Sequence, residues 1–332
     1  MQSYKYHSIL ILIIVFLSGC EGFNEINNIG KDQLREASDK IMTLDIPEVP
    51  HPSERESGRI YGWGDNDALN YIPEGDDFVE VSAGVHLARA FALKSDGTPV
   101  LIGDDGWGER GFDEHVWQDE ADCNDPQHGH KPRYLSVTPH LGLREDSTLV
   151  SWHGEFQVSQ SSGFVAISGY TALHEDGSVS VLGMPAESFS PPSGNDYVAI
   201  SQGGGGTYLL LLDKNGVVHI YGDDYGDGHA YHDNRLSDSE ERFTTISAGL
   251  DHQVAIDDDG KITTWGDNTY NQHDHPDTDG WQQVAAGHTH SAVLNDEGRI
   301  MAWGSNDKVV NYPTESGFIM ISAGNNYTLG IR

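Results

Sequence analysis

Two histidines occupy the same place in two stretches of the chain that share one pattern. The stretches are ISAGLDHQVAIDDDGKITTWG (246–266) and VAAGHTHSAVLNDEGRIMAWG (284–304), with His252 and His290 in the matching position. Histidines repeated in this way could form a ring of metal ligands or proton-transfer groups. Two further units have tyrosine at this position, namely Tyr208 and Tyr327. Because packing tolerates such an exchange and catalysis rarely does, we expect these side chains to pack in strands and to hydrogen-bond a neighbour.

Other candidate metal ligands lie outside this pattern. Cys123, His128 and His130 are ligand types that zinc prefers, but their spacing matches no established zinc pattern. A cluster of aspartates and histidines over residues 267–279 fails as a calcium loop, because the first ligand position would fall on His275 and the last on Ala286. We therefore predict solvated acidic loops, no metal and no cofactor, and keep Cys123, His128 and His130 as the metal candidates.

The chain contains no familiar enzyme motif. A nucleophile elbow, a phosphate-binding glycine loop and a metalloprotease helix are all absent from the sequence. The GGGG run at 203–206 accompanies a predicted strand and precedes no helix. We predict no catalytic residues. The alternative is an envelope enzyme or glycan-binding protein that uses loop carboxylates and aromatics, since carboxylates about 5–10 Å apart can hydrolyse glycosides.

The elements that would hold these residues are short strands joined by tight turns. Period-two alternation on either side of an Asp-Gly or Asn-Gly pair predicts a β-hairpin, because these residues accept the positive φ of a tight turn. Candidate turn pairs recur along the chain at Ser57-Gly58, Asp96-Gly97, Asp146-Ser147, Asp176-Gly177, Asn215-Gly216, Asp259-Gly260 and Glu297-Gly298. The sequence therefore predicts seven sheet-like units.

The two ends of the repeating region each lack what the other has. The first unit begins at Gly58 with only a late strand, and the chain finishes on FIMISAGNNYTLGIR, which supplies only early strands. Joined, they complete one sheet and leave no open edge, whereas an open solenoid would need capping repeats. We predict an all-β, seven-bladed β-propeller over residues 58–332, closed by N- and C-terminal strands that share one blade.

The repeat pattern ISAG…H…VAI..DG.I..WG resembles that of the regulator of chromosome condensation family. Its length of about 40 residues is similar to the short bacterial form of the repeat, as in the propeller-type β-lactamase inhibitory protein. The resemblance covers roughly residues 58–332, is closest in the last three units, and is faintest over 135–183. Inhibition of a secreted or periplasmic enzyme is implied only by analogy, because the family's contact loops cannot be matched here residue by residue.

Large apolar residues precede the glycine that ends each unit. This place is occupied by Trp63, Ile102, Trp152, Leu182, Tyr221, Trp265 and Trp303. Bulky side chains at one repeated place predict packing between neighbouring blades. The loops that follow differ from unit to unit, and loops held by a rigid scaffold are where a propeller carries its function.

Aromatic residues gather in these variable loops. Aromatic side chains outside a core pattern are typical of hot spots in protein interfaces, although some of them could pack a loop against its own face. The candidate partner-binding residues are Trp107, Phe112, Trp117, Tyr225, Tyr231 and Tyr270. We predict a non-enzymatic scaffold, itself a monomer, that binds a protein partner of unknown identity through its loop-rich face.

The N-terminus predicts export and lipid anchoring. Lys5 precedes the apolar run 9–17, which suits a signal peptide and is too short to span a bilayer. The sequence LSGC at 17–20 resembles the bacterial lipobox, which implies removal of residues 1–19 and acylation of Cys20, for instance with palmitate. The alternative is an ordinary secretory cleavage site with an incidental cysteine. Residues 20–57, rich in charge, Asn and Pro, predict a flexible tether.

The net charge and the number of cysteines restrict the possible partners and the cellular location. The net charge of −33 argues against nucleic acid and against adhesion to anionic lipid head groups, so the acyl anchor would hold the chain at the membrane. Only Cys20 and Cys123 are present, so the exported domain cannot contain an internal disulfide. Glu21, where an aspartate would resemble an inner-membrane signal, favours the outer membrane. We expect a lipid-anchored protein of the bacterial cell envelope, either periplasmic or surface-exposed.

Overall fold

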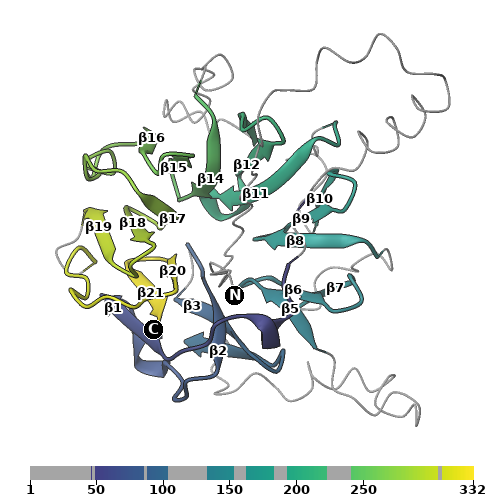
Figure 1. Ribbon diagram of the computed structural model, residues 1–332, viewed down its shortest axis with the longest axis horizontal. Helices are drawn as coiled ribbons and strands as arrows, with labels where there is room; N and C mark the ends of the chain where they lie inside the picture. Colours follow the sequence, from purple (N-terminus) through teal and green to yellow (C-terminus); the bar gives the residue numbers. More distant parts are fainter. Residues whose placement is uncertain are drawn as a thin grey trace, which may run out of the picture.

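A computed structural model describes Ile46 and residues 49–85, 88–103, 133–152, 162–182, 193–222, 241–305 and 309–332. Figure 1 shows small sheets arranged in a ring around a common axis, with the chain running once around the ring. There are seven such sheets in the described residues, each of three antiparallel strands. The all-β, seven-bladed prediction is therefore confirmed.

The sheets are numbered as blades in chain order. Blade 1 contains β2 (Phe78–Ala83), β3 (Arg89–Lys94) and β4 (Pro99–Gly103), and blade 2 contains β5 (Tyr134–Val137), β6 (Leu141–Arg144) and β7 (Leu149–Ser151). Blade 3 contains β8 (Phe164–Ser168), β9 (Thr171–His174) and β10 (Val179–Val181), and blade 4 contains β11 (Tyr197–Gly203), β12 (Tyr208–Asp213) and β13 (Val218–Gly222). Blade 5 contains β14 (Phe243–Ala248), β15 (His252–Asp257) and β16 (Ile262–Gly266), and blade 6 contains β17 (Trp281–Ala286), β18 (His290–Asn295) and β19 (Ile300–Gly304).

Blade 7 joins the two ends of the repeating region. It contains β20 (Met320–Ala323) and β21 (Tyr327–Ile331) from the C-terminal part, with β1 (Ile60–Gly64) as its third strand. β1 and β21 pair antiparallel over five residue pairs, from Ile60 opposite Ile331 to Gly64 opposite Tyr327. The predicted closure by a shared blade is confirmed, and the ring is held shut by this strand pair.

Six of the seven candidate turn pairs form the expected hairpins. The second residue of each has positive φ, with values of 81° at Gly97, 61° at Ser147, 77° at Gly177, 78° at Gly216, 79° at Gly260 and 73° at Gly298. Ser57-Gly58 was wrongly predicted as a seventh turn, because Gly58 instead forms an isolated bridge to Phe78. The early strands of that blade come from the other end of the chain, so no hairpin is needed at this point.

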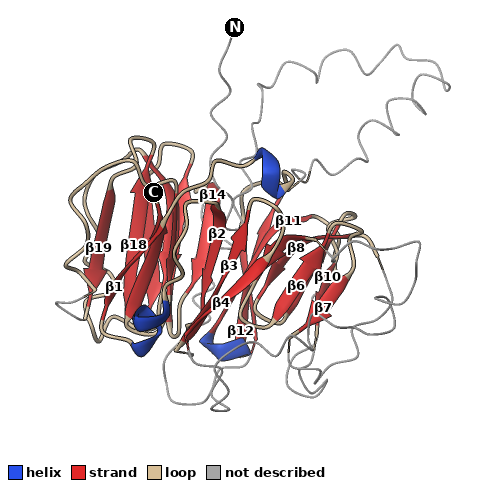
Figure 2. Cartoon of the chain, turned by 90° about the horizontal axis from the view of Figure 1, so that it is seen from below, coloured by secondary structure: helices blue, strands red, loops and turns tan. Residues whose placement is uncertain are grey.

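The strand directions give the ring two different faces. The hairpin turns between the second and third strands of blades 1 to 6 lie on one face, called the turn face. The loops that leave the third strand of each blade begin on the opposite face, called the loop face. Figure 2 shows the ring from the side, with the C terminus on the turn face and short helices on both faces. The variable loops therefore leave their blades on the face opposite the C terminus, and a binding site formed by them is expected there.

Neighbouring blades share apolar clusters, as the recurring bulky residues predicted. Trp303 of blade 6 packs in one cluster with Val254 and Ile256 of blade 5, and Trp63 of blade 7 packs with Leu294 of blade 6. Trp152, Trp265, Ile102 and the partly buried Leu182 and Tyr221 also lie in or against such clusters. Burial of an aromatic side chain of this kind stabilises by about 3–5 kcal/mol relative to alanine, so these contacts are a main source of inter-blade cohesion.

Hydrogen bonds around the inner strands form a second link between blades. A serine near the end of one inner strand accepts the backbone N–H of the next blade at 2.9–3.0 Å in four places: Ser322 to Ala83, Ser168 to Gln202, Ser201 to Ala248 and Ser247 to Ala286. Blade 6 has Ala285 at the serine position, and there Gln283 accepts the Ile321 N–H at 2.9 Å instead. The conserved geometry explains why ISAG recurs.

The segment before β1 also lies against the propeller. Residues 49–57 include the short helix η2 (Pro52–Glu54) and Arg55, whose side chain is 7% exposed. The sequence places these residues in a flexible tether, so the last part of the predicted tether is in contact with the folded domain. No helix in the described part of the chain has the length and apolar character needed to cross a membrane.

Candidate functional site

The loop after blade 7 is held in a defined conformation on the loop face. The Asn66 side chain accepts the Ala68 N–H at 2.9 Å and caps the short helix η3 (Asp67–Tyr71). The same side chain donates to the Asn325 carbonyl in the β20–β21 connection at 2.8 Å, and Ala68 is fully buried. With its helix fixed in this way, Tyr71 points outward and is 49% exposed.

The loop after blade 5 is built around a buried glutamine. Gln272 is 1% exposed, its side chain donates to Asp267 at 3.1 Å, and it accepts the Tyr270 N–H at 2.7 Å. Asp267 also accepts the N–H of Thr269 at 3.0 Å, which is the usual role of an aspartate that opens a turn. The Tyr270 backbone is thereby fixed while its side chain is 48% exposed.

Tryptophans of the next blade attach the loops after blades 5 and 6 to the scaffold. The Trp303 indole donates to the Gln272 carbonyl at 2.7 Å, and the Trp63 indole donates to the Val309 carbonyl at 3.2 Å. Each buried indole N–H thus finds its acceptor in the loop of the preceding blade. The sequence predicted these tryptophans as packing residues, and the structure adds that two of them position the loops.

Tyr71 and Tyr270 are the large hydrophobic side chains exposed in the described part of the chain. Tyr270 was a predicted partner-binding residue, and Tyr71 was missed because it ends a loop that reads mainly as polar. Exposed tyrosines on fixed loops present apolar area with little loss of side-chain entropy on binding. The other predicted residues, Trp107, Phe112, Trp117, Tyr225 and Tyr231, lie outside the described residues, as do Cys20, Cys123, His128 and His130.

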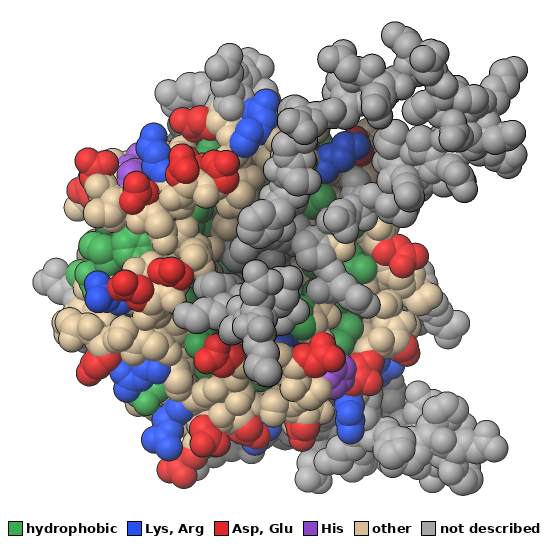
Figure 3. Space-filling view, in the orientation of Figure 1, with side chains coloured by type: hydrophobic (Ala, Val, Ile, Leu, Met, Phe, Trp, Pro, Cys, Tyr) green, Lys and Arg blue, Asp and Glu red, His purple; other side chains and the backbone are tan. Residues whose placement is uncertain are grey.

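Charge is distributed unevenly between the two faces. Asp65, Asp67, Asp251, Asp267 and Asp274 lie in described loop-face connections, and residues 65–72, 249–251 and 267–275 contain no lysine or arginine. On the turn face, Lys94 pairs with Asp77 at 3.1 Å and Lys214 pairs with Asp196 at 2.6 Å. Figure 3, which views the ring along its axis, shows basic side chains interspersed with acidic ones. These three loop-face connections therefore carry carboxylates and no lysine or arginine, which suits a basic partner.

The two repeated histidines are structural. His252 Nε2 lies 2.8 Å from the Ser291 hydroxyl and His290 Nε2 lies 2.9 Å from the Thr328 hydroxyl, in each case across a blade boundary. Both rings are fully buried, and burial lowers the pKa of His252 to about 4 and that of His290 to about 3. Tyrosine also forms a hydrogen bond across a blade boundary at this position, since the Tyr208 hydroxyl donates to the Gly249 carbonyl of the next blade at 2.8 Å. The expectation of packing and neighbour bonding is confirmed.

A central cavity of about 490 Å³ lies between the inner strands. Its lining includes inner-strand serines, Glu80 and the stacked rings of His140 and Tyr170, whose centroids are 3.8 Å apart. Neither His252 nor His290 lines it, so these histidines do not form a ring of ligands around the channel. Within the described residues no group of three or more His, Cys, Asp or Glu side chains is placed to hold a metal ion.

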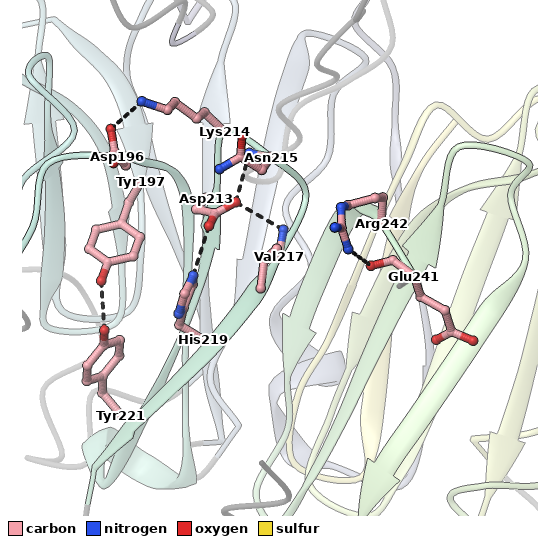
Figure 4. Close-up of polar contacts among 10 residues, drawn as sticks. All are labelled: Asp196, Tyr197, Asp213, Lys214, Asn215, Val217, His219, Tyr221, Glu241 and Arg242. Carbon is pink, nitrogen blue, oxygen red and sulfur yellow. Dashed lines mark hydrogen bonds and ion pairs between the residues drawn. The ribbon is translucent and has the colours of Figure 1, made fainter. Parts of the chain in front are cut away.

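Figure 4 shows a polar cluster in blade 4. His219 Nε2 lies 3.0 Å from Asp213, whose other oxygen accepts the N–H groups of Asn215 at 2.8 Å and Val217 at 3.1 Å. Asp213 is therefore engaged in stabilising the hairpin turn. The Tyr197 and Tyr221 hydroxyls share a hydrogen bond of 2.7 Å, and burial is the main cause that raises the Tyr197 pKa above its ordinary value. These contacts account for the cluster as part of the blade.

Comparison with known proteins identifies a repeat family that matches part of the chain. The model of the regulator of chromosome condensation (RCC1) repeat matches residues 243–272 and 281–308, in blades 5 and 6. A search of curated proteins finds no match.

Solved structures resemble the chain in fold. The crystal structure of Kap60 bound to yeast RCC1 (Prp20) matches with a TM-score of 0.61 and 11% identity, covering 96% of this chain and 97% of that one. The ectodomain of the Physcomitrella patens receptor kinase CR4 matches with a TM-score of 0.52 and 18% identity, covering 74% of this chain and 67% of that one. The chain is thus a seven-bladed β-propeller whose residues 243–272 and 281–308 match the RCC1 repeat and whose fold is similar to that of yeast RCC1.

Proposed function

We propose that the protein is an exported scaffold that binds a protein partner through its loop face. The observation that carries the proposal is the pair of exposed tyrosines, Tyr71 and Tyr270, on loops that hydrogen bonds to the blades hold in place. Fixed aromatic side chains with an acidic surround fit the central anchors of an interface with a basic protein surface. Yeast RCC1, which has the same fold, is seen bound to the protein Kap60, and this supports a binding role without naming the partner.

The proposal includes export and a lipid anchor at the N-terminus. It rests on the short apolar run at 9–17 and the lipobox-like sequence before Cys20. Two acyl chains on Cys20 would hold the protein stably at a membrane, which one chain does only marginally. In this arrangement the propeller is displayed from the cell envelope, with the outer membrane as the proposed location.

Loss of the two exposed tyrosines is expected to weaken partner capture. The double variant Tyr71→Ala/Tyr270→Ala should reduce retention of the partner by on the order of tenfold or more, because it removes two large aromatic contacts. Its unfolding free energy should stay within about 0.5 kcal/mol of the wild type, since both residues are exposed. Affinity purification from envelope extract, with quantification of the protein that the wild type retains, measures the effect.

The matched control is Asp258→Ala, an exposed position in a hairpin of the turn face. This variant should retain the partner as the wild type does. Retention should also fall as salt rises from 50 to 500 mM, because screening weakens attraction to the acidic loops. Equal retention by the double variant and the wild type would contradict the proposed face, as would a loss of retention confined to Asp258→Ala.

A further inference from the structure

Arg55 inserts into the propeller from the segment that precedes it. Its guanidinium lies 2.7 Å from the Glu80 carboxylate of blade 1, and the two side chains are 7% and 2% exposed. A second guanidinium nitrogen donates to the Leu135 carbonyl of blade 2, and Nε donates to the Pro50 carbonyl at 2.9 Å. One arginine outside the blades thus contacts two neighbouring blades and its own segment.

Glu80 is the hydrogen-bond acceptor at the blade 1–blade 2 boundary. At four other blade boundaries a serine accepts the backbone N–H of a residue near the end of the next inner strand, as Ser201 does from Ala248. Blade 2 has Pro139 at the donor position, and proline has no N–H. Glu80 instead accepts the Val137 N–H at 2.9 Å and the Ser136 hydroxyl at 2.8 Å. A carboxylate buried there requires a counter-charge, which Arg55 supplies.

The rest of the segment follows the turn face. His51 Nε2 lies 2.6 Å from the Glu145 carboxylate in the blade 2 hairpin turn, and Ile46 packs against a cluster that includes Tyr197 of blade 4. Residues 49–57 thus contact blade 2 before the chain enters β1 in blade 7. The contact of His51 with Glu145 therefore places this segment on the turn face, opposite the loop face.

We propose that residues 49–57 form a strap, locked by Arg55 and Glu80, that fixes the side of the propeller from which the preceding chain departs. The strap holds the loop face pointing away from the N-terminal segment. Combined with the proposed function, on which this consequence alone rests, the strap presents the binding face away from the anchoring membrane. A freely jointed tether would leave that orientation to chance.

The test is trypsin cleavage after Arg55 in the full chain, followed as the fragment that begins at Glu56. In the wild type the ion pair protects this bond. The Glu80→Gln variant keeps an acceptor for Val137, as Gln283 does at the blade 6–blade 7 boundary, but removes the charge that holds Arg55. We expect cleavage after Arg55 to accelerate by on the order of tenfold or more, because local opening of the strap no longer breaks a buried ion pair.

A control and a second variant keep the test decisive. Asp77→Asn removes a partly exposed ion pair with Lys94 on the same face, and it should leave cleavage at Arg55 unchanged. Arg55→Lys keeps a trypsin site and a charge but loses the contacts with Pro50 and Leu135, so cleavage should accelerate even if Glu80→Gln fails to fold. Equal cleavage rates after residue 55 in the wild type and in the folded variants would overturn the strap.

The outcome is independent of partner binding. Protection at Arg55 is measured on the purified chain alone, so it can hold while the proposed loop-face function fails. If the strap is confirmed and the Tyr71→Ala/Tyr270→Ala variant still retains the partner, the domain is oriented as proposed but binds through another surface. If cleavage is rapid in the wild type, the orientation is lost and the loop-face proposal stands on its own test.

Discussion

Between pH 7 and pH 4.5, the free energy of unfolding of the variant His290→Tyr is expected to fall by about 2–3 kcal/mol less than that of the wild type. Burial lowers the pKa of His290 to about 3, against about 6.5 in the unfolded chain. The unfolded state therefore binds a proton over a range in which the folded state does not. The resulting stability is fully present above pH 6.5 and is lost as the pH falls toward 3. Tyrosine has no such titration in this range.

Tyrosine should fit the site because two other blades use it there. Tyr327 is fully buried beside Gly324, as His290 is beside Gly287, and its hydroxyl donates to the Arg89 carbonyl of the next blade at 2.8 Å. The glycine at this place leaves room that a side chain with a Cβ would fill. We therefore expect His290→Tyr to fold and to keep a bond across the blade boundary.

Urea unfolding at the two pH values, for the wild type and the variant, measures the difference. The many carboxylates of the chain titrate in both proteins and cancel in the comparison. His275→Gln, at a partly exposed ring, is the histidine control and should follow the wild type. An identical pH dependence for His290→Tyr and the wild type would show that the buried ring does not control acid stability.

Removal of residues 327–332 is expected to abolish cooperative folding. The deletion takes away β21, the central strand of blade 7, together with the buried side chains of Tyr327, Leu329 and Ile331. β1 then loses the strand it pairs with, and blade 1 loses three of the side chains against which it packs. Each lost core side chain costs about 2–5 kcal/mol, so the sum reaches the whole stability of a typical domain, about 5–15 kcal/mol.

The graded control is Arg332→Ala. The Arg332 guanidinium lies 4.6 Å from the Tyr61 ring centroid, and this substitution should cost only about 1 kcal/mol because the strand pairing remains. Circular dichroism, gel filtration and thermal unfolding of the two proteins provide the comparison. A soluble deletion variant with a wild-type melting transition would contradict closure of the ring through blade 7.

The strands and the closure of the ring could be predicted from the sequence because both depend on local sequence patterns. The positive-φ turn residues from Gly97 to Gly298 and the alternation around them specify hairpins, and the incomplete ends required each other. Ser57-Gly58 was a false prediction of a turn, because a dipeptide that ends in glycine forms a hairpin only when strands flank it on both sides. The histidine-for-tyrosine exchange identified a packing position without any coordinates.

Contacts between distant residues could not be predicted from the same signals. Arg55 lies in a segment with a polar sequence and Glu80 lies in a strand. Nothing in either local sequence indicates that the two side chains meet in the interior. The attachment of Gln272 to the Trp303 indole depends on the rotation between two blades, which no repeat pattern specifies. Tyr71 was missed for a related reason, since exposure of a single aromatic is decided by how its loop is held.

Site-specific photocrosslinking tests the loop-face function most directly. A photoreactive phenylalanine analogue at position 270 places the probe on the loop face, and the same residue at position 258 places it on the turn face. In cells that produce the protein, position 270 is predicted to yield a discrete crosslinked protein that is absent at position 258. A crosslinked product from position 258 alone, or none from position 270, would contradict partner binding through the loop face.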